Sequence, residues 1–398
     1  MASLASRAFE RAPILRESVE TRGRVAVTRL TVTDFRNYAR LRLELGHECA
    51  VLTGPNGAGK TNLLEALSFL APGKGLRRAK LSEPDRRTSD GAASGAWAVA
   101  ATVETESGAT TIGTGHEGEN GGAERRVVRI DGAARGQKDL AEILSIVWLT
   151  PEMDRLFMDG PSGRRRFLDR LVFSFDPEHA SRVAAYEQCL RERARLLAEG
   201  RTDPAWLDAL EDGMARHGVA VAAARAAVAA RIDRAAAEGI GPFPSARVAT
   251  SGDVDSWLAE MPALAVEDRL RAALAASRAQ DAHVGGASAG PHRADMEVRF
   301  AAKDRPACEC STGEQKALLL SIVLAVAREL VAERGRPPLL LLDEVVAHLD
   351  GARRAALFDE LVALGAQAWL AGTDDELFGP LRGRAQFFRV LDANVTPR

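Results

Sequence analysis

A glycine-rich stretch early in the chain has the residues and the spacing of a phosphate-binding loop. It matches the pattern G-x-x-x-x-G-K-[ST] and consists of Gly54, Pro55, Asn56, Gly57, Ala58, Gly59, Lys60 and Thr61. Such glycines let the backbone wrap around phosphate groups, the lysine places a positive charge between the β- and γ-phosphates, and the threonine hydroxyl can bind Mg²⁺. Because the chain contains only six lysines, a chance match is not expected. The stretch predicts a nucleoside triphosphate site.

Two adjacent carboxylates follow an apolar run near the C-terminal end. Residues 339–342 are four leucines that read as a strand buried on both faces, and Asp343 and Glu344 come directly after them. Carboxylates at such a position are costly to bury without a partner, and a magnesium ion is the natural partner. We therefore expect Asp343 to hold Mg²⁺ and Glu344 to act as the general base that polarises an attacking water.

A second candidate for phosphate binding precedes these carboxylates. Ser311, Gly313 and Gln315 lie in the stretch STGEQ, which leads from a turn of small residues into a long apolar helix. Free backbone N–H groups and the helix dipole favour an anion at such a helix start. Taken alone, the stretch is equally well explained as an ordinary helix cap. Its position between Lys60 and Asp343 favours the functional interpretation.

The order of these motifs resembles that of the ATP-binding-cassette ATPases. In that superfamily, the Ser-x-Gly-x-Gln signature of one subunit closes over the γ-phosphate held by the P-loop of another. The resemblance implies that the signature residues contact the ATP of a second copy, and that Asp350 in the stretch HLD belongs to a D-loop crossing the same interface. It also implies an ATP-dependent homodimer.

Two elements of transport cassettes lack an obvious counterpart in this chain. No histidine stands near Gly372 and Thr373, where a switch histidine is usual. Gln137 and Glu152 are both candidates for the Q-loop position, and the sequence does not decide between them. Which residue senses the γ-phosphate within one subunit is left open.

The periodicity of apolar residues places the motifs on strands and helices. β-Type alternation begins at Val25, and further strands are expected at 49–53, 97–103, 127–130, 296–300 and finally 368–371, with turns at 119–124 and 131–136. Helices are expected at 61–70, through 177–239 with a break at Gly200 and a start at Asp203-Pro204, and at 266–279. The middle of the chain is therefore helical and is inserted into an α/β unit built from both ends.

Longer stretches sharpen the resemblance to one family. LTVTDFRNYARLRLEL, the P-loop region GPNGAGKTNLLEALSFLAPGKGLRRA, PEMDRLFMDGPSGRRRFLDRLV, GPHRADMEV and CSTGEQKALLLSIVLA are similar to segments of the RecF family, whose heads are similar to those of SMC proteins. The similar segments span residues 25–373. Those around Arg36 and Asn37 (FRNY) and at 164–169 (RRRFLD) are the most family-specific, and the resemblance places Arg36 and Asn37 beside the nucleotide.

The resemblance implies a fold, a set of partners and a domain division. The fold is an ABC-ATPase (SMC-like) head of the α/β class, with a P-loop core, an antiparallel β subdomain and an inserted α-helical domain. We expect a flexible extension at 1–24, head segments at 25–155 and 290–398, and the insertion at 156–289. The implied function is an ATP-dependent dimer that binds gapped duplex DNA at junctions of single and double strands. With RecO and RecR it helps RecA to displace single-strand-binding protein, in replication, repair and the SOS response, and weak ATP hydrolysis releases the DNA.

Three basic features bear on the implied DNA-binding function. The first cluster holds Lys74, Arg77, Arg78 and Lys80, and the second holds residues 164–166, all arginines. Both are candidates for phosphate contacts on DNA, and the alternative for each is ordinary solvated surface. His292 and Arg293 in the stretch GPHR are expected to brace the head.

Composition and charge argue against a globally basic protein, a membrane or secreted protein, and a zinc protein. The net charge of −2 indicates no global basic field, so an anionic partner must be bound by local patches. No apolar run approaches the length of a membrane span and no secretory segment is evident, so a cytoplasmic protein is expected. Cys308 and Cys310 have no accompanying ligand cluster, so no zinc site is expected.

Three rival functions share part of this motif pattern. A structural SMC protein, or the SMC-like head associated with a repair nuclease, shares every ATPase motif. The structural SMC proteins have several hundred residues of heptads where this chain has about 250 residues between P-loop and signature. A transporter ATPase subunit would keep the switch histidine, and a metabolic kinase would have no use for the signature.

Overall fold

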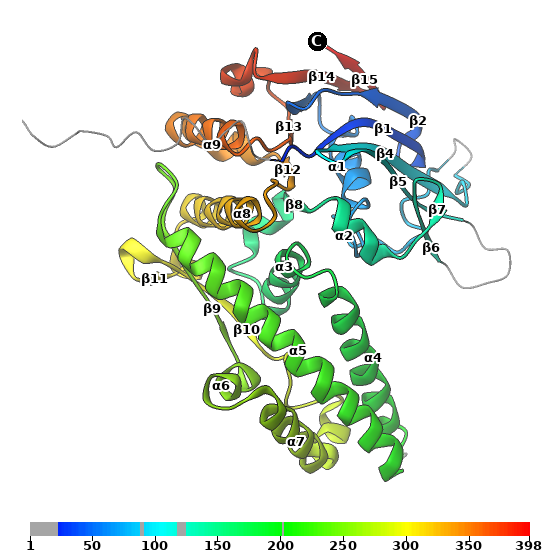
Figure 1. The fold of residues 1–398 in the computed structure, drawn as a ribbon, viewed down its shortest axis with the longest axis vertical. Coiled ribbons are helices and arrows are strands. Elements are labelled where there is room, and N and C mark those ends of the chain that lie inside the picture. Colours follow the sequence, from blue (N-terminus) through cyan, green and yellow to red (C-terminus); the bar gives the residue numbers. More distant parts are fainter. Residues whose placement is uncertain (1–22, 88–90, 118–124, 201–202) are drawn as a thin grey trace, which may run out of the picture.

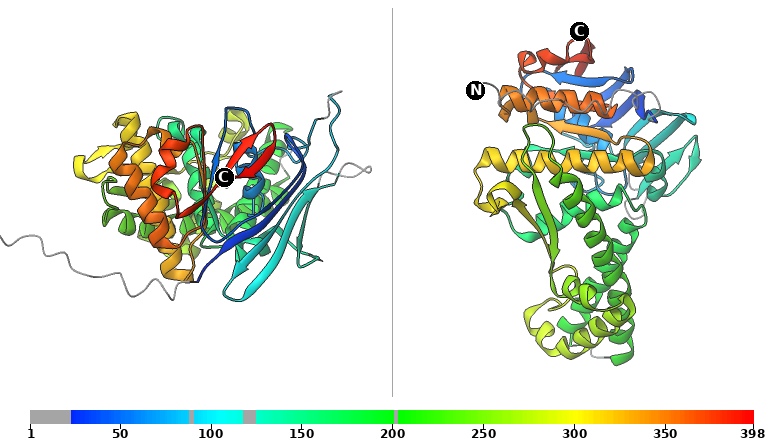
Figure 2. Two further views of the ribbon diagram at one scale, coloured as in Figure 1. Left: turned by 90° about the horizontal axis from the view of Figure 1, so that it is seen from above. Right: turned by 60° about the vertical axis from the view of Figure 1, so that its left-hand side comes forward.

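Residues 23–87, 91–117, 125–200 and 203–398 are described by a computed structural model. The predicted extension at 1–24 lies outside the described residues apart from its last two, and the predicted turn at 119–124 lies wholly outside them. The described part consists of a mixed α/β head and a helical arm that extends away from it, on the side opposite the C-terminus (Figure 1; Figure 2, right).

A six-stranded sheet at the centre of the head carries the nucleotide motifs. Its order is β15-β14-β3-β13-β12-β8, and all strands but β15 are parallel to their neighbours. The bounds are β3 Cys49–Thr53, β8 Ile146–Leu149, β12 Leu339–Asp343, β13 Ala368–Gly372, β14 Ala385–Leu391 and β15 Asn394–Pro397. Every residue of β3, β8, β12 and β13 is buried, as expected of parallel strands covered on both faces. The predicted strands at 49–53, 339–342 and 368–371 are confirmed, but the expectation that the last of them ends the strand series is wrong, because β14 and β15 follow.

A second sheet is antiparallel and lies beside the P-loop. Its order is β2-β1-β4-β5-β6-β7, with β1 Ala26–Phe35, β2 Tyr38–Glu44, β4 Trp97–Thr105, β5 Gly108–His116, β6 Arg126–Ile130 and β7 Ala133–Ala134. The Val27 N–H donates to the Gln367 side-chain oxygen, and the Gln367 side-chain nitrogen donates to the Val27 carbonyl, so that this sheet is tied to the central one. The rings of Phe35, Phe69 and Trp97 pack on one another beneath it, and so fix the turn between β1 and β2 relative to the first helix.

Within the described residues, five helices belong to the head. They are α1 Lys60–Ser68, α2 Leu140–Ile143, α3 Pro161–Phe173, α8 Thr312–Arg334 and α9 Gly351–Leu364, and short 3₁₀ turns include η2 Pro151–Arg155, η5 Val345–His348 and η6 Asp375–Leu381. Helix α8 is buried over most of its length because it packs between the central sheet and the arm helix α5. Ser311 caps it in a capping box with Glu314, and Asp350 caps α9.

The arm is formed by α4 His179–Ala198, α5 Pro204–Ala237, α6 Asp253–Glu260 and α7 Ala263–Val284. A three-stranded sheet of β9 Ala246–Ser251, β10 Asp295–Phe300 and β11 Arg305–Pro306 connects it to the head. The predicted break at Gly200 and the N-cap at Asp203, whose side chain accepts from the Ala205 N–H, are confirmed. Arg193 lies buried between the helices and pairs with Glu211 and Asp281, so that α4, α5 and α7 share one ionic network. The arm lies within the predicted insertion, whose boundaries stay a prediction.

The arm joins the head through a second buried network. Asp169 on α3 accepts two hydrogen bonds from Arg225 on α5, which also donates to the Pro291 carbonyl. His292 Nε2 donates to the Ala287 carbonyl, so its Nδ1 accepts from the Tyr186 hydroxyl, and burial lowers the pKa of this neutral imidazole. His292 therefore links α4 to the segment that follows α7, and the expectation that it braces the head stays a prediction.

Candidate nucleotide-binding site

The P-loop connects β3 to α1 in a conformation that requires glycine. Gly59 has φ 114°, and a Cβ there would lie 2.5 Å from the Asn37 side-chain nitrogen. The neighbouring β1–β2 turn supports the loop: the Asn37 amide donates to the Ala58 carbonyl at 3.3 Å, and the Tyr38 hydroxyl donates to the Gly59 carbonyl at 3.1 Å. Asn37, predicted beside the nucleotide, thus lies against the loop. The part played by Tyr38 was missed, although it stands next to Asn37 in the family-specific stretch.

Lys60 folds back onto its own loop. Its Nζ donates to the carbonyls of Gly54 at 2.7 Å and Pro55 at 3.0 Å, and lies 4.0 Å from Glu344 Oε1. Burial lowers the pKa of Lys60, and the carboxylates of Glu344 and Asp343 oppose that shift. A phosphate group, which carries more negative charge than a carbonyl, could draw this ammonium out of the loop.

Thr61 and Asp343 meet at the mouth of the site. The Thr61 hydroxyl donates to Asp343 Oδ2 at 2.8 Å, whereas Oδ1 is buried and has no hydrogen-bond partner among the described residues. Burial raises the pKa of Asp343, and the neighbouring Glu344 raises it further. A hydroxyl and an orphaned carboxylate oxygen are ligands that suit Mg²⁺, so the pair fits the predicted metal role.

Glu344 lies beside a small cavity of about 30 Å³, room for one water. It has a left-handed backbone, φ 54°, which is uncommon for a residue other than glycine and turns the chain from β12 into η5. Thr150, Asp154, Lys316 and His348 are among the residues that line the same cavity. Lys316 forms an ion pair of 2.7 Å with Asp154, a contact between the signature helix and the segment after β8 that the sequence did not indicate.

The two candidates for the Q-loop position lie in different surroundings. Glu152 belongs to η2, whose residues Pro151 and Asp154 line the cavity beside Glu344. Gln137 instead accepts hydrogen bonds from the Gly73 backbone and from Arg126. Glu152 itself is exposed and is not among the residues that line this cavity, so the identity of the Q-loop residue stays open.

Arg36 is turned toward a different partner from the one expected. Its guanidinium donates to both carboxylate oxygens of Glu65, a fully buried residue of α1, and to the Glu83 carbonyl. In the structure Arg36 therefore contacts α1, the helix that begins at the P-loop lysine, and a direct contact with nucleotide stays a prediction.

The signature presents an uncovered helix start. Ser311 and Gly313 are exposed, and a Cβ added to Gly313 would meet no atom within 4 Å. Gln315 is buried instead: its amide nitrogen donates to the Cys310 carbonyl and its oxygen has no partner among the described residues. Gln315 thus shapes the turn, and the exposed N–H groups around Gly313 are free for an anion. Asp350 is exposed, and its carboxylate accepts from the Arg353 N–H.

The two basic clusters lie near each other, but only some of their side chains are without a hydrogen-bond or ion-pair partner among the described residues. Arg164 is paired with Asp295, and Arg165 donates to the Ala294 carbonyl, so both are occupied in joining α3 to β10. Arg166 and Arg78 are exposed and have no side-chain partner among the described residues. The pKa of Arg78 is lowered, first by lost hydration and second by the charge of Arg166, which shows that the two clusters are neighbours. We name the residues Lys74, Arg78, Lys80 and Arg166 the junction patch.

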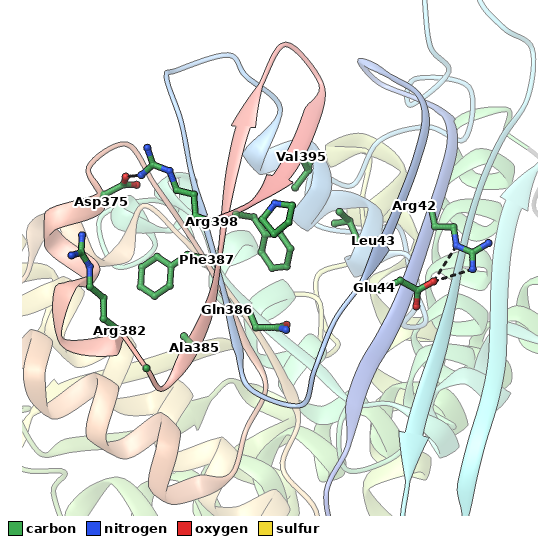
Figure 3. Close-up of a pocket in the computed structure, with 13 residues that line it drawn as sticks. Arg42, Leu43, Glu44, Asp375, Arg382, Ala385, Gln386, Phe387, Val395 and Arg398 are labelled. Atoms are coloured by element: carbon green, nitrogen blue, oxygen red, sulfur yellow. Dashed lines mark hydrogen bonds and ion pairs between the residues drawn. The ribbon is translucent and has the colours of Figure 1, made fainter.

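A much larger cavity of about 770 Å³ lies elsewhere, between β2 and the β14–β15 hairpin (Figure 3). Its described lining includes none of the predicted nucleotide-site residues. The arginines at its rim are engaged in part, since Arg42 pairs with Glu44 and Arg398 with Asp375. Size alone therefore does not identify the site of nucleotide chemistry.

Substitution of Lys60 by arginine is expected to abolish ATP-driven dimerisation. The lysine side chain is buried, and a planar guanidinium cannot reach the β- and γ-phosphates from the same position as a compact ammonium. Sedimentation with and without ATP measures the effect. Lys138→Arg, at an exposed lysine paired with Glu178, is the matched control. An unchanged monomer–dimer response in Lys60→Arg would count against Lys60 as a phosphate ligand.

Among the described helices, none is both long enough and apolar enough to cross a membrane.

Comparison with known proteins gives a family model and relatives that point to the same family. Residues 26–377 match the family model described as RecF/RecN/SMC N terminal domain. The chain is 49% identical over 379 residues to the DNA replication and repair protein RecF of Mesorhizobium japonicum, with 93% of this chain and 97% of the relative covered. It is also 49% identical over 383 residues to the RecF of Caulobacter vibrioides, with 93% and 98% covered.

Solved structures show the same fold. The recombination mediator protein RecF of the RecFOR pathway, solved as RecF-ATPrS, superposes with a TM-score of 0.82 at 21% identity, covering 95% of this chain and 99% of that one. An Smc head domain from Pyrococcus furiosus superposes with a TM-score of 0.52 at 16% identity, covering 94% and 96%.

Proposed function

We propose that this chain, which belongs to the RecF family, is an ATP-dependent DNA-binding recombination mediator. It dimerises on ATP, binds gapped DNA at junctions of single and double strands, and with RecO and RecR promotes the loading of RecA. The ATPase part rests on one observation: the Thr61 hydroxyl, in the first turn of α1, lies 2.8 Å from the carboxylate of Asp343, the last residue of β12. Membership of the RecF family supports the other parts of the proposal, which are dimerisation, DNA binding, and the loading of RecA together with RecO and RecR.

The residues of one chain would bind ATP and prepare it for hydrolysis. The P-loop backbone and Lys60 bind the phosphates, and Thr61 with Asp343 would hold Mg²⁺, which neutralises charge on the β- and γ-phosphates. Glu344, next to a cavity with room for one water, accepts the proton of the attacking water. Hydrolysis is expected to be weak and to act as a switch.

A second copy would complete the site. The exposed helix start at Ser311 and Gly313 faces solvent in the single chain, so its free N–H groups can meet the γ-phosphate held by another protomer. Asp350, exposed at the start of α9, belongs to the same surface by the family pattern. This arrangement makes dimerisation depend on ATP.

The junction patch is the DNA contact that the structure supports best. Arg78 and Arg166 come from different elements, lie close enough to repel each other and form no direct ion pair among the described residues, although the charges of Glu187 and Asp169 also act on Arg78. Two unpaired guanidiniums at the base of the arm are stabilised by a phosphodiester backbone. Arg164 and Arg165 are excluded from this role by their contacts with β10 and the residue before it.

Loss of one junction-patch arginine should weaken DNA binding without changing ATP binding. For Arg166→Ala we expect lower DNA affinity and a log–log salt dependence that is flatter by about 1, because one phosphate contact is lost. Fluorescence anisotropy with a gapped duplex at four salt concentrations measures the slope. Arg216→Ala, which removes an exposed arginine paired with Asp212 on the arm, is the control. Equal slopes for Arg166→Ala and the control would remove Arg166 from the interface.

The proposed function is tested by sedimentation on a fluorescent gapped duplex with ATP and then with ADP. Two protomers per DNA with ATP, and release with ADP, are the expected results. A nucleotide-independent monomer on DNA would overturn the mediator mechanism. The alternative, an SMC-like head of a structural or nuclease-associated protein, is disfavoured because the α4–α5 hairpin packs against α6 and α7 in a compact arm.

A further inference from the structure

We propose that Glu65 is the positioning residue through which bound nucleotide and bound DNA influence each other. The inference rests on the proposed function, because it requires that DNA phosphates reach the junction patch. It assigns no contact with either ligand to Glu65 itself.

Glu65 is a fully buried carboxylate shared by two arginines. It lies in the second turn of α1, the helix that begins at the P-loop lysine. Arg36 donates to both of its oxygens, at 2.6 and 2.9 Å, and Arg77 donates to Oε2 at 2.5 Å. Arg36 thus gives each oxygen of the buried carboxylate a partner, Arg77 adds a second donor to Oε2, and both arginine side chains are partly exposed.

Arg36, Glu65 and Arg77 form a triad, and one side of this triad is connected to the P-loop. Arg36 belongs to the β1–β2 turn, and the next two residues, Asn37 and Tyr38, donate to the carbonyls of the P-loop residues Ala58 and Gly59. The Asn37 oxygen also accepts from the Asn62 side chain on α1. A change in the P-loop on phosphate binding is therefore transmitted to the position of Arg36 by direct hydrogen bonds.

The other side leads to the junction patch and to the metal-site carboxylate. Arg77 stands next to Arg78 in the loop that also carries Lys74 and Lys80. It donates to the Asn62 side chain at 2.8 Å. Asn62 follows Thr61 in α1, and the Thr61 hydroxyl donates to Asp343 at 2.8 Å, so Arg77 is linked to the metal-site carboxylate through these two residues.

The charges explain why the triad can respond to both ligands. Two positive groups share one negative group, so a phosphate near either exposed guanidinium competes with Glu65 for it. Movement of one arginine leaves the other to hold the buried carboxylate alone. Two ligands that bias the same arrangement must change each other's affinity by the same factor.

The experiment measures that factor. Affinity for a slowly hydrolysed ATP analogue is measured with and without a saturating gapped duplex, and affinity for the duplex with and without the analogue, at one salt concentration. For the unchanged protein we expect the ratio of the affinities measured with and without the other ligand to be about fivefold or more, for either ligand. In Glu65→Gln the ratio should fall to within about twofold of one, while each ligand alone binds nearly as before. Glu44→Gln, at an exposed carboxylate on β2 paired with Arg29 and Arg42, should keep the ratio.

A second variant keeps the test decisive if Glu65→Gln does not fold. Arg77→Gln breaks the same contact from the partly exposed side and should also lose the ratio. Retention of the ratio in the variants that fold would overturn the inference while leaving the proposed function intact. If neither ligand changes the affinity for the other in the unchanged protein, the inference is overturned as well. Failure of the unchanged protein to bind DNA at all would instead refute the proposed function.

Discussion

Replacement of Glu344 by glutamine is expected to lower ATP turnover by at least about 100-fold and to trap the ATP-bound dimer. General-base catalysis contributes about 10²–10⁴-fold, and an amide cannot accept the proton of the attacking water. The substitution preserves shape at a side chain that is only partly exposed and whose nearest cation is Lys60 at 4.0 Å, so ATP binding should survive. Phosphate release gives the turnover, and sedimentation with ATP gives the lifetime of the dimer.

The control for this experiment is Glu297→Gln, the same chemical change at an exposed position of β10. It should turn over ATP as the unchanged protein does. Turnover of Glu344→Gln within about threefold of that value would place the base elsewhere, and His348, which lines the same cavity, would be examined next.

Replacement of Ser311 by arginine should separate ATP binding from dimerisation. A long side chain at the uncovered start of α8 fills the space that the γ-phosphate of a second copy would occupy. A central interface substitution of this kind costs about 2 kcal/mol or more, so the dimer should weaken by at least about 30-fold. Affinity of the monomer for ATP should stay within about twofold. Both quantities are obtained from equilibrium titrations below and above the dimer's dissociation constant.

Loss of the capping box in Ser311→Arg has its own effect on stability. The serine hydroxyl accepts from the Glu314 N–H, and its removal is expected to cost about 1 kcal/mol of unfolding free energy. Ala332→Arg places the same side chain at an exposed position near the other end of α8 and serves as the control for charge and bulk. A large loss of ATP affinity in the Ser311→Arg monomer would mean that the signature acts on its own chain's nucleotide.

What the sequence predicted correctly depends on local rules. The strand before the P-loop, the cap at Asp203 and the buried strand before Asp343 follow from apolar period, proline position and side-chain capping, each readable within about ten residues. The strands β8 and β9 were missed, as was helix α3. Strand β8 has only four residues, and β9 alternates small and polar residues, so that neither has a strong local signal. Helix α3 is rich in arginine, which hides its apolar stripe.

Side-chain roles were predicted less well because their partners are distant in the sequence. Arg36 was expected at the nucleotide, but its partner Glu65 becomes visible only when α1 lies beside the β1–β2 turn. Arg164 and Arg165 were candidates for DNA contact, with solvated surface as the alternative, yet they donate to residues 131 and 129 positions away. By contrast, the positions of Lys60, Thr61 and Asp343 could be predicted, since their motifs fix the ends of parallel strands in one sheet.

The order of strands in the central sheet has a consequence for synthesis on the ribosome. Strand β3 lies between β13 and β14, and the link from Val27 to Gln367 joins residues 340 positions apart. The nucleotide site therefore cannot assemble until almost the whole polypeptide has emerged, whereas the arm, whose helices contact their sequence neighbours, can form while translation continues. A chain that terminates early leaves both edges of β3 unpaired and open to pairing with other chains. Premature termination should thus yield aggregation-prone fragments with a folded arm and no ATPase.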